Sequence, residues 1–177
     1  MTSTLTAQIP SRTSSHALDF EALYRAARDD VYAYVATLLR DRAAAEDVTA
    51  AAFERAYRKQ RTYKASRGSE RAWLFGIARN AALDELRRRA RAASLAAEPA
   101  DVDATPLEDA AEAALRRAAV RVGLAQLGAR ERELIALKFH AGLDNAEIAA
   151  VLGVSVSNAG TQLHRAMTKL REAVEHA

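Results

Sequence analysis

The sequence contains no cysteine and, for its length of 177 residues, little glycine, proline or aromatic residue. Without cysteine it can form neither a disulfide framework nor a thiolate metal site, which fits the reducing cytoplasm. Only 7 glycines and 3 prolines interrupt a chain rich in alanine, the best helix former. Period-two alternation of apolar and polar residues is rare, so the pattern predicts an all-α protein.

Long apolar runs are missing as well. None approaches the roughly 18 residues that a membrane-spanning helix needs, and residues 1–17 lack the basic-then-apolar pattern of a secretion signal. We therefore expect a cytoplasmic protein without membrane insertion, with a disordered tail at 1–17. The histidines are scattered without metal-ligand spacing or a neighbouring nucleophile, so we expect no catalytic residue, cofactor or metal; they are His16, His140, His164 and His176.

Residues 18–92 form a first helical block. Apolar residues recur at three- and four-residue steps over 19–39, 42–59 and 70–91, and each stretch predicts a helix with one buried stripe. Asp19 and Ser69 are predicted N-caps. The third predicted helix ends in the basic run "RRRAR". The aromatic residues predicted to face inward are Phe20, Tyr24, Tyr34, Phe53, Tyr57 and Trp73.

An acidic linker at 93–110 follows. Prolines at 99 and 106 oppose a continuous helix, and every charge in "SLAAEPADVDATPLEDAAE" is negative, so this segment joins two domains. An ordinary solubilising spacer has the same composition, which by itself favours that simpler interpretation. The acidic residues are Glu98, Asp101, Asp103, Glu108, Asp109 and Glu112.

The second block, 111–177, contains a predicted helix ending near Val122 and a further core-facing stripe that stops at Gly142, a residue suited to a helix C-terminus. The predicted inward residues of this stripe are Leu127, Leu134, Ile135, Leu137 and Phe139.

The stretch "DNAEIAAVLGVSVSNAGTQLHRAMTKLR" predicts a helix-turn-helix. Asp144 and Glu147 have the spacing of a capping box, Gly153 supplies a positive-φ turn, and Ser155 caps the second helix. An αα-hairpin buried in a bundle is the alternative, but the outward face is more polar than a bundle helix would show. Side chains on this face can hydrogen-bond to base edges or phosphates; they are Ser157, Asn158, Thr161, Gln162 and Arg165.

Three stretches in order, "DRAAAEDVTAAAFERAYR", "RAWLFGIARNAALDELRRR" and "EIAAVLGVSVSNAGTQLHRAMTKLR", resemble bacterial RNA polymerase sigma factors of the sigma-70 family, most of all the short extracytoplasmic-function (ECF) group. The resemblance covers roughly residues 20–172. It implies two small helical domains, sigma region 2 and the helix-turn-helix sigma region 4, joined by the acidic flexible linker.

The resemblance also implies a function: binding core RNA polymerase, directing it to specific promoters and helping to open the −10 region. The competing class is a stand-alone helix-turn-helix regulator that dimerises through its N-terminal helices, although no receiver or ligand-pocket pattern is present. An enzyme is disfavoured because no constellation of reactive residues occurs.

In the family, the helix matching residues 42–59 docks on the clamp of the largest polymerase subunit, while region 4 meets the flap of the second-largest. An exposed acidic cluster beside apolar surface suits a basic helical partner, although a solvated helix face is the simpler interpretation. Ala50 and Ala51 stand where the family usually has Gln-Glu. The residues that match the polymerase-binding positions are Asp41, Glu46, Asp47, Thr49 and Phe53.

The loop "RTYKASRGSERAW" matches the family's specificity loop, which captures a flipped base of the −10 non-template strand. Stacking and pocket contacts of this kind are worth roughly 1–3 kcal/mol per base. Trp73 and Phe75 occur at helical spacing and are predicted to be core residues instead. The residues assigned to −10 DNA by the resemblance are Tyr63, Lys64, Ser66, Arg67, Arg71, Arg79, Asn80 and Arg87, with Arg88 and Arg89 beside them.

The resemblance assigns the second helix of the helix-turn-helix to the −35 element. Family members often carry Lys and Arg where this chain has Gly160 and Gln162, and each lost phosphate contact flattens the logarithmic salt slope by about 0.9. We expect weaker backbone anchoring, partly replaced by neighbouring side chains and by arginines of the preceding helix. The assigned −35 residues are Arg130, Arg132, Ser155, Ser157, Asn158, Thr161, Gln162 and Arg165.

By the same resemblance, the acidic linker threads through the polymerase, where a negative strand occupies a basic nucleic-acid channel. Family members are often held by an anti-sigma factor that wedges between the two domains. We therefore expect core RNA polymerase, promoter DNA and an anti-sigma factor as partners, and a monomer when the protein is free. No appended C-terminal sensory domain is expected.

Overall fold

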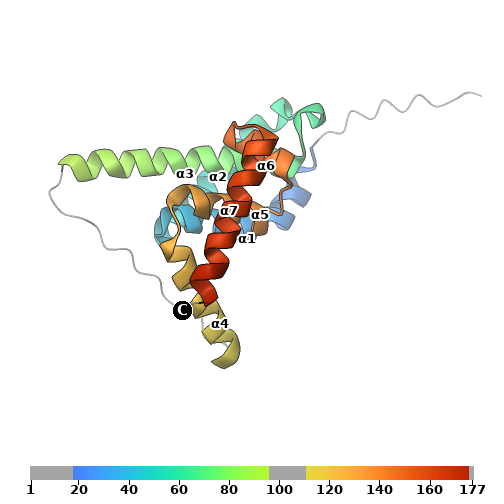
Figure 1. The fold of residues 1–177 in the computed structure, drawn as a ribbon. Helices are drawn as coiled ribbons and strands as arrows, with labels where there is room; N and C mark the ends of the chain where they lie inside the picture. Colours follow the sequence, from blue (N-terminus) through green and yellow to red (C-terminus); the bar gives the residue numbers. More distant parts are fainter. Residues whose placement is uncertain (1–17, 96–110, 176–177) are drawn as a thin grey trace, which may run out of the picture.

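The computed structural model describes residues 18–95 and 111–175, and within these ranges every regular element is a helix (Figure 1). The predicted all-α class is confirmed. The tail at 1–17 and the acidic segment at 96–110 lie outside the described residues. The helices are α1 (Phe20–Leu39), α2 (Arg42–Lys59), η1 (Gln60–Thr62), η2 (Ala65–Arg67), α3 (Glu70–Leu95), α4 (Ala111–Gln126), α5 (Ala129–Phe139), α6 (Asn145–Leu152) and α7 (Val156–Glu175).

Side chains cap the helices where the sequence predicts caps. Asp19 accepts a hydrogen bond from the Ala22 amide at 3.0 Å, and Ser69 Oγ accepts one from the Ala72 amide at 3.1 Å. Each cap satisfies an amide that the first helical turn leaves without an intrahelical partner. Helix α3 continues to Leu95, beyond its predicted end and into the predicted linker, because no proline or glycine stops it before Pro99.

Helices α1, α2 and α3 pack against one another and bury the first apolar stripe. Tyr34 and Phe75 are fully buried, with their rings edge to face at a centroid distance of 5.4 Å. Two predicted core residues are exposed instead: Tyr24 is 40% exposed and Tyr57 is 58% exposed. Both rings lie edge to face against aromatic residues of the neighbouring helix, Tyr57 against Phe20 and Tyr24 against Phe53.

In the C-terminal part, α4, α5 and α6 each pack against α7, and Figure 1 shows α4 alongside the end of α7. Gly123 permits α4 to pack closely against α7, because an added Cβ would lie 3.0 Å from the side chains of both Leu170 and Val174. Phe139, predicted to face inward, is 61% exposed. It is the last residue of α5, one turn beyond the buried Ile135, so the stripe ends before it.

The two helical parts share one continuous core. Helix α5 packs against α1, and α6 packs against α3. Leu134, Leu137 and Ile148 from the C-terminal part belong to the same buried cluster as Tyr34 and Phe75. Within the ranges that the structure describes, no helix is long and apolar enough to span a bilayer.

Candidate nucleic-acid and polymerase interfaces

The helix-turn-helix has the predicted local geometry. Asp144 and Glu147 form the capping box, with the Glu147 amide donating to Asp144 Oδ1 at 2.8 Å and the Asp144 amide donating to Glu147 Oε2 at 3.0 Å. Gly153 ends α6 at φ 68°, in the left-handed region that favours glycine. Ser155 Oγ then caps α7 by accepting from the Asn158 amide at 3.2 Å. The turn therefore holds α6 and α7 in a fixed relation.

The outward face of the first turns of α7 is polar. Ala159 and Leu163 turn inward, and this leaves the assigned side chains on the opposite face. Gln162 is half-buried and its amide nitrogen donates to Asn158 Oδ1 at 2.7 Å. The exposed members of the face are Ser157, Asn158, Thr161 and Arg165.

The sequence placed Gly160 and the arginines of α5 on the DNA-facing surface, but the structure places them against other parts of the protein. A Cβ at Gly160 would meet Asn145 Nδ2 at 3.4 Å, so this position faces the start of α6. Arg130 donates to Glu133 at 2.9 Å, and Arg132 donates to the Leu127 carbonyl. Partial burial lowers the pKa of Arg132, and the nearby Arg40 charge lowers it further. Both α5 arginines therefore bind groups of α5 itself or of the segment just before it.

The loop between α2 and α3 is a compact structure made by η1 and η2. Tyr63 Oη donates to the Gly68 carbonyl at 3.1 Å, and its ring lies 5.7 Å from the Trp73 ring. Gly68, at φ 134°, occupies backbone space that other residues rarely adopt. Burial, with a smaller contribution from Glu70, raises the pKa of Tyr63. A hollow of about 470 Å³ opens here, lined in part by Tyr63, Lys64, Arg67, Trp73 and Asn80.

Two of the arginines assigned to −10 DNA point away from this loop. Arg71 donates to the Asp30 carboxylate and to the carbonyls of His140, at 3.0 Å, and Ala141. Arg79 Nε donates to Glu133 Oε1 at 2.6 Å. The sequence could not reveal these contacts, because each joins residues more than 40 positions apart. Lys64, Ser66, Arg67 and Asn80 are exposed, and Arg87 pairs with Asp84 at 3.2 Å.

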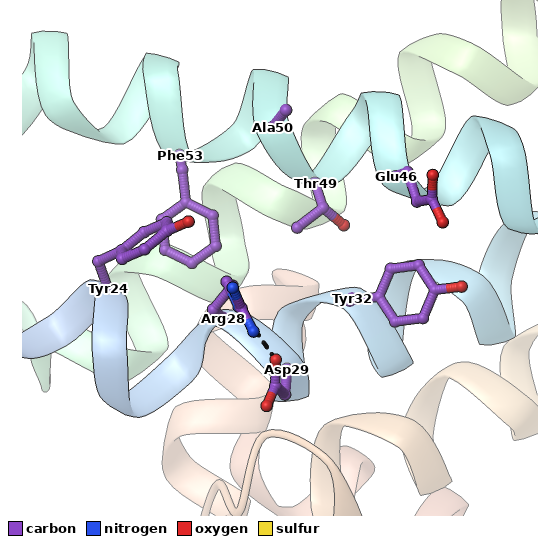
Figure 2. Close-up of a pocket in the computed structure, with 8 residues that line it drawn as sticks. All are labelled: Tyr24, Arg28, Asp29, Tyr32, Glu46, Thr49, Ala50 and Phe53. Carbon is purple, nitrogen blue, oxygen red and sulfur yellow. Dashed lines mark hydrogen bonds and ion pairs between the residues drawn. The ribbon is translucent and has the colours of Figure 1, made fainter.

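A groove of about 640 Å³ separates α1 from α2 (Figure 2). Helix α2 supplies three of the assigned polymerase-binding residues, Glu46, Thr49 and Phe53, together with Ala50. The other wall was not predicted. It comes from α1, where four-residue spacing places Tyr24, Arg28 and Tyr32 on one face with Asp29 beside them, and this spacing is the signal that could have revealed it.

The assigned residues of α2 differ in exposure, so the expected exposed cluster is only partly present. Glu46 and Asp47 are exposed, whereas Phe53 and Thr49 are buried. Thr49 is 8% exposed and its hydroxyl finds no hydrogen-bond partner in the described part of the chain. Asp41 caps α2 through the Ala44 amide at 3.1 Å and pairs with Arg89; these two contacts, the amide first, lower its pKa.

Comparison with known proteins places the chain in a family. The model of Sigma-70 region 2 matches residues 23–92, and that of Sigma-70, region 4 matches residues 117–170. The ECF RNA polymerase sigma factor SigL of Mycobacterium tuberculosis is 34% identical over 168 residues, covering 91% of this chain and 94% of SigL. The ECF RNA polymerase sigma factor SigX of Bacillus subtilis is 28% identical and covers 88% of this chain and 84% of its own length.

Solved structures have the same fold over both helical parts. The sigma factor RpoE of Bartonella quintana, crystallised with the anti-sigma factor NepR, superposes with a TM-score of 0.74 at 23% identity, covering 89% of this chain and 97% of RpoE. CnrH, solved in complex with the cytosolic domain of CnrY, gives a TM-score of 0.62 at 24% identity, covering 89% of this chain and 88% of CnrH.

The two matched regions and the helix-turn-helix define a two-part, promoter-directing transcription initiation factor. The chain belongs to the sigma-70 family of RNA polymerase sigma factors, in its ECF group. The stand-alone regulator considered above is not favoured, because such a protein would not carry region 2.

Proposed function

We propose that this sigma factor binds its partners through three separate surfaces. The α1–α2 groove binds the clamp of the largest polymerase subunit, the η1–η2 loop captures the −10 non-template strand, and the outward face of α7 reads the −35 element. The protein performs no bond chemistry and works in the cytoplasm, where the polymerase and promoter DNA meet. Region 4 contacts the flap of the second-largest subunit, and an anti-sigma factor holds the free monomer.

The observation that carries the polymerase assignment is the hydroxyl of Thr49. It lines the groove, is almost wholly buried, and lacks a hydrogen-bond partner among the described residues. An unsatisfied buried polar group costs about 1–3 kcal/mol. The hydroxyl oxygen itself is out of contact with solvent, so a partner helix seated in the groove supplies the missing contact only by displacing the atoms that cover it. Glu46 of the same groove attracts basic side chains.

The loop assignment is supported by a hollow whose walls carry what base capture needs. Tyr63 and Trp73 offer aromatic surface, Lys64 and Arg67 are exposed cations, and Asn80 offers an amide. Base stacking on such side chains is worth about 1–3 kcal/mol and tolerates different bases. On α7, the exposed amide of Asn158 and guanidinium of Arg165 suit base edges and phosphates.

The test is capture of core RNA polymerase by the purified chain, followed by run-off transcription on DNA of the source genome. Stable capture with discrete start sites is expected. Glu46→Lys should reduce capture at least fivefold. Glu54→Lys makes the same charge change on α2 outside the groove and should not. DNA binding without polymerase capture would instead support the stand-alone regulator.

A further inference from the structure

We infer that a pocket between α1, α3 and α5 is a binding site for a small monocarboxylate with a short apolar tail. The pocket has a volume of about 210 Å³ and shares no lining residue with the α1–α2 groove or with the hollow at the η1–η2 loop. It therefore lies outside the three surfaces of the proposed function. Three leucines and three charged residues decide its chemistry: Leu38, Leu83, Leu86, Arg130, Arg132 and Glu133.

The pocket has more positive than negative charge. Among the described residues that line it, Glu133 is the only carboxylate, and it already accepts from Arg79 at 2.6 Å and from Arg130 at 2.9 Å. Arg132 donates to the Leu127 carbonyl and forms no ion pair with any residue that the structure describes. A guanidinium has five N–H donors, so most donors of Arg132 are open to a ligand.

Arg40 adds a second uncompensated cation next to the pocket. It is exposed, directly follows α1, and forms no ion pair within the described ranges. Partial burial and then the Arg40 charge lower the pKa of Arg132, whereas Glu131 raises it. Glu131 itself binds Lys169 at 2.9 Å and the Gly128 amide at 2.7 Å. A bound anion would relieve the repulsion between the two arginines that no carboxylate of the described chain now neutralises.

The rest of the pocket suits a hydrocarbon tail. Leu38, Leu83 and Leu86 are half-buried, so each still presents apolar surface to solvent. A tail lying against them removes this surface and its own from water, and this stabilises the complex in proportion to the buried area. The volume is below the roughly 300–1,000 Å³ of pockets that hold drug-sized ligands, so the tail is short.

The charged residues also select the head group. Arginine binds a carboxylate through two parallel hydrogen bonds, a geometry that a phosphate shares. Glu133 lines the same pocket, and it repels a doubly charged phosphate more strongly than a singly charged carboxylate. The uncompensated arginines together with Glu133 therefore favour a monocarboxylate.

Hexanoate is the probe for this class, with acetate as the head group alone and 1-hexanol as the tail alone. Each is titrated into the full chain, labelled with ¹³C at its leucine methyl groups, at pH 7 and constant ionic strength. Hexanoate should shift the methyl signals of Leu38, Leu83 and Leu86 and bind about fivefold or more tightly than either control. It should also raise the unfolding temperature, because it binds the folded chain. Absence of binding, equal affinity for 1-hexanol, or tighter binding of inorganic phosphate would each overturn the inference.

Charge variants locate the head group. Arg132→Gln and Arg40→Gln should each weaken hexanoate binding about threefold or more and leave 1-hexanol binding unchanged. Arg40 is exposed, so its variant covers the case in which loss of the Arg132 contact to Leu127 prevents folding. Arg171→Gln removes an exposed cation of α7 outside the pocket and is the matched control. If Arg171→Gln weakens hexanoate binding as much as Arg40→Gln does, only the net charge attracts the anion and the site is overturned.

A leucine variant locates the tail. Leu83→Ala should weaken hexanoate binding about threefold and leave acetate binding unchanged, because only the longer ligand reaches this side chain. An equal loss for both ligands would contradict the assigned tail site. Neither polymerase nor DNA enters any of these titrations, so their outcome is independent of whether the proposed function holds.

Discussion

The guanidinium of Arg89 near the end of α3 lies 2.8 Å from the carboxylate of Asp41, the N-cap of α2. The same guanidinium lies 2.7 Å from Glu85, one turn earlier on α3. Three arginines of the basic run therefore form a paired cluster, since Arg88 also pairs with Glu85 and Arg87 with Asp84. Part of the charge of this run links the start of α2 to the C-terminal half of α3, so the run offers less charge to phosphate than the sequence suggests.

The Glu85 cluster gives a prediction about pH. Hydrogen bonds from Arg88 and then Arg89 lower the pKa of Glu85 to about 2. Because the pKa is lower in the folded chain, this stabilisation is present above the ordinary carboxyl pKa and is lost as the pH falls toward 2. Glu85→Gln should reduce the free energy of unfolding by about 1 kcal/mol at pH 7. Urea unfolding at pH 7 and pH 3 should show a smaller difference at pH 3, whereas an unchanged difference would contradict the assignment.

Gly160 gives a prediction about stability. Gly160→Ala should stabilise the chain by up to about 1 kcal/mol, because alanine favours the helix and the new Cβ meets only the flexible end of Asn145. Gly123→Ala is the contrasting variant, since its Cβ would lie 3.0 Å from Leu170 and Val174 and should destabilise by about 1–3 kcal/mol. Thermal unfolding measures both. A loss of stability in Gly160→Ala would show that the Asn145 side chain cannot move aside for the new Cβ.

Gln162 gives a prediction about salt dependence. Gln162→Lys restores a cation on the α7 face, so affinity for a −35 duplex should rise and the logarithmic salt slope should steepen by about 0.9. Fluorescence anisotropy over a series of salt concentrations measures the slope. Gln126→Lys adds the same charge at an exposed position of α4, outside the proposed −35 face, and serves as the control. Equal slopes for the two variants would remove Gln162 from the −35 surface.

Thr49 gives a prediction with two readouts of opposite sign. Thr49→Val should raise the free energy of unfolding by about 1 kcal/mol, because it removes a buried hydroxyl that has no partner among the residues the structure describes. The same variant should weaken polymerase capture if a partner donates to that hydroxyl. Thr37→Val is the control: its hydroxyl already donates to the Ala33 carbonyl at 2.8 Å, so the variant should lose stability and keep polymerase capture.

Local signals in the sequence predicted most of the fold. The helices α1, α3 and α7 begin where Asp19, Ser69 and Ser155 place a capping oxygen. The turn of the helix-turn-helix lies at Gly153, as its positive φ requires. These features depend on residues three or four positions apart, so they can be read from the chain. The three motifs quoted above are also short local stretches, so their order along the chain was enough to indicate the family.

The tertiary structure alone decided which of the candidate residues are available to a partner. Arg71 and Arg79 look like free cations in the sequence, but Asp30 and Glu133 bind them across gaps of 41 and 54 residues. Tyr24 and Arg28 became part of the groove only because α2 lies beside α1. A sequence fixes helices and caps through short-range chemistry, whereas burial and charge pairing depend on how distant helices pack.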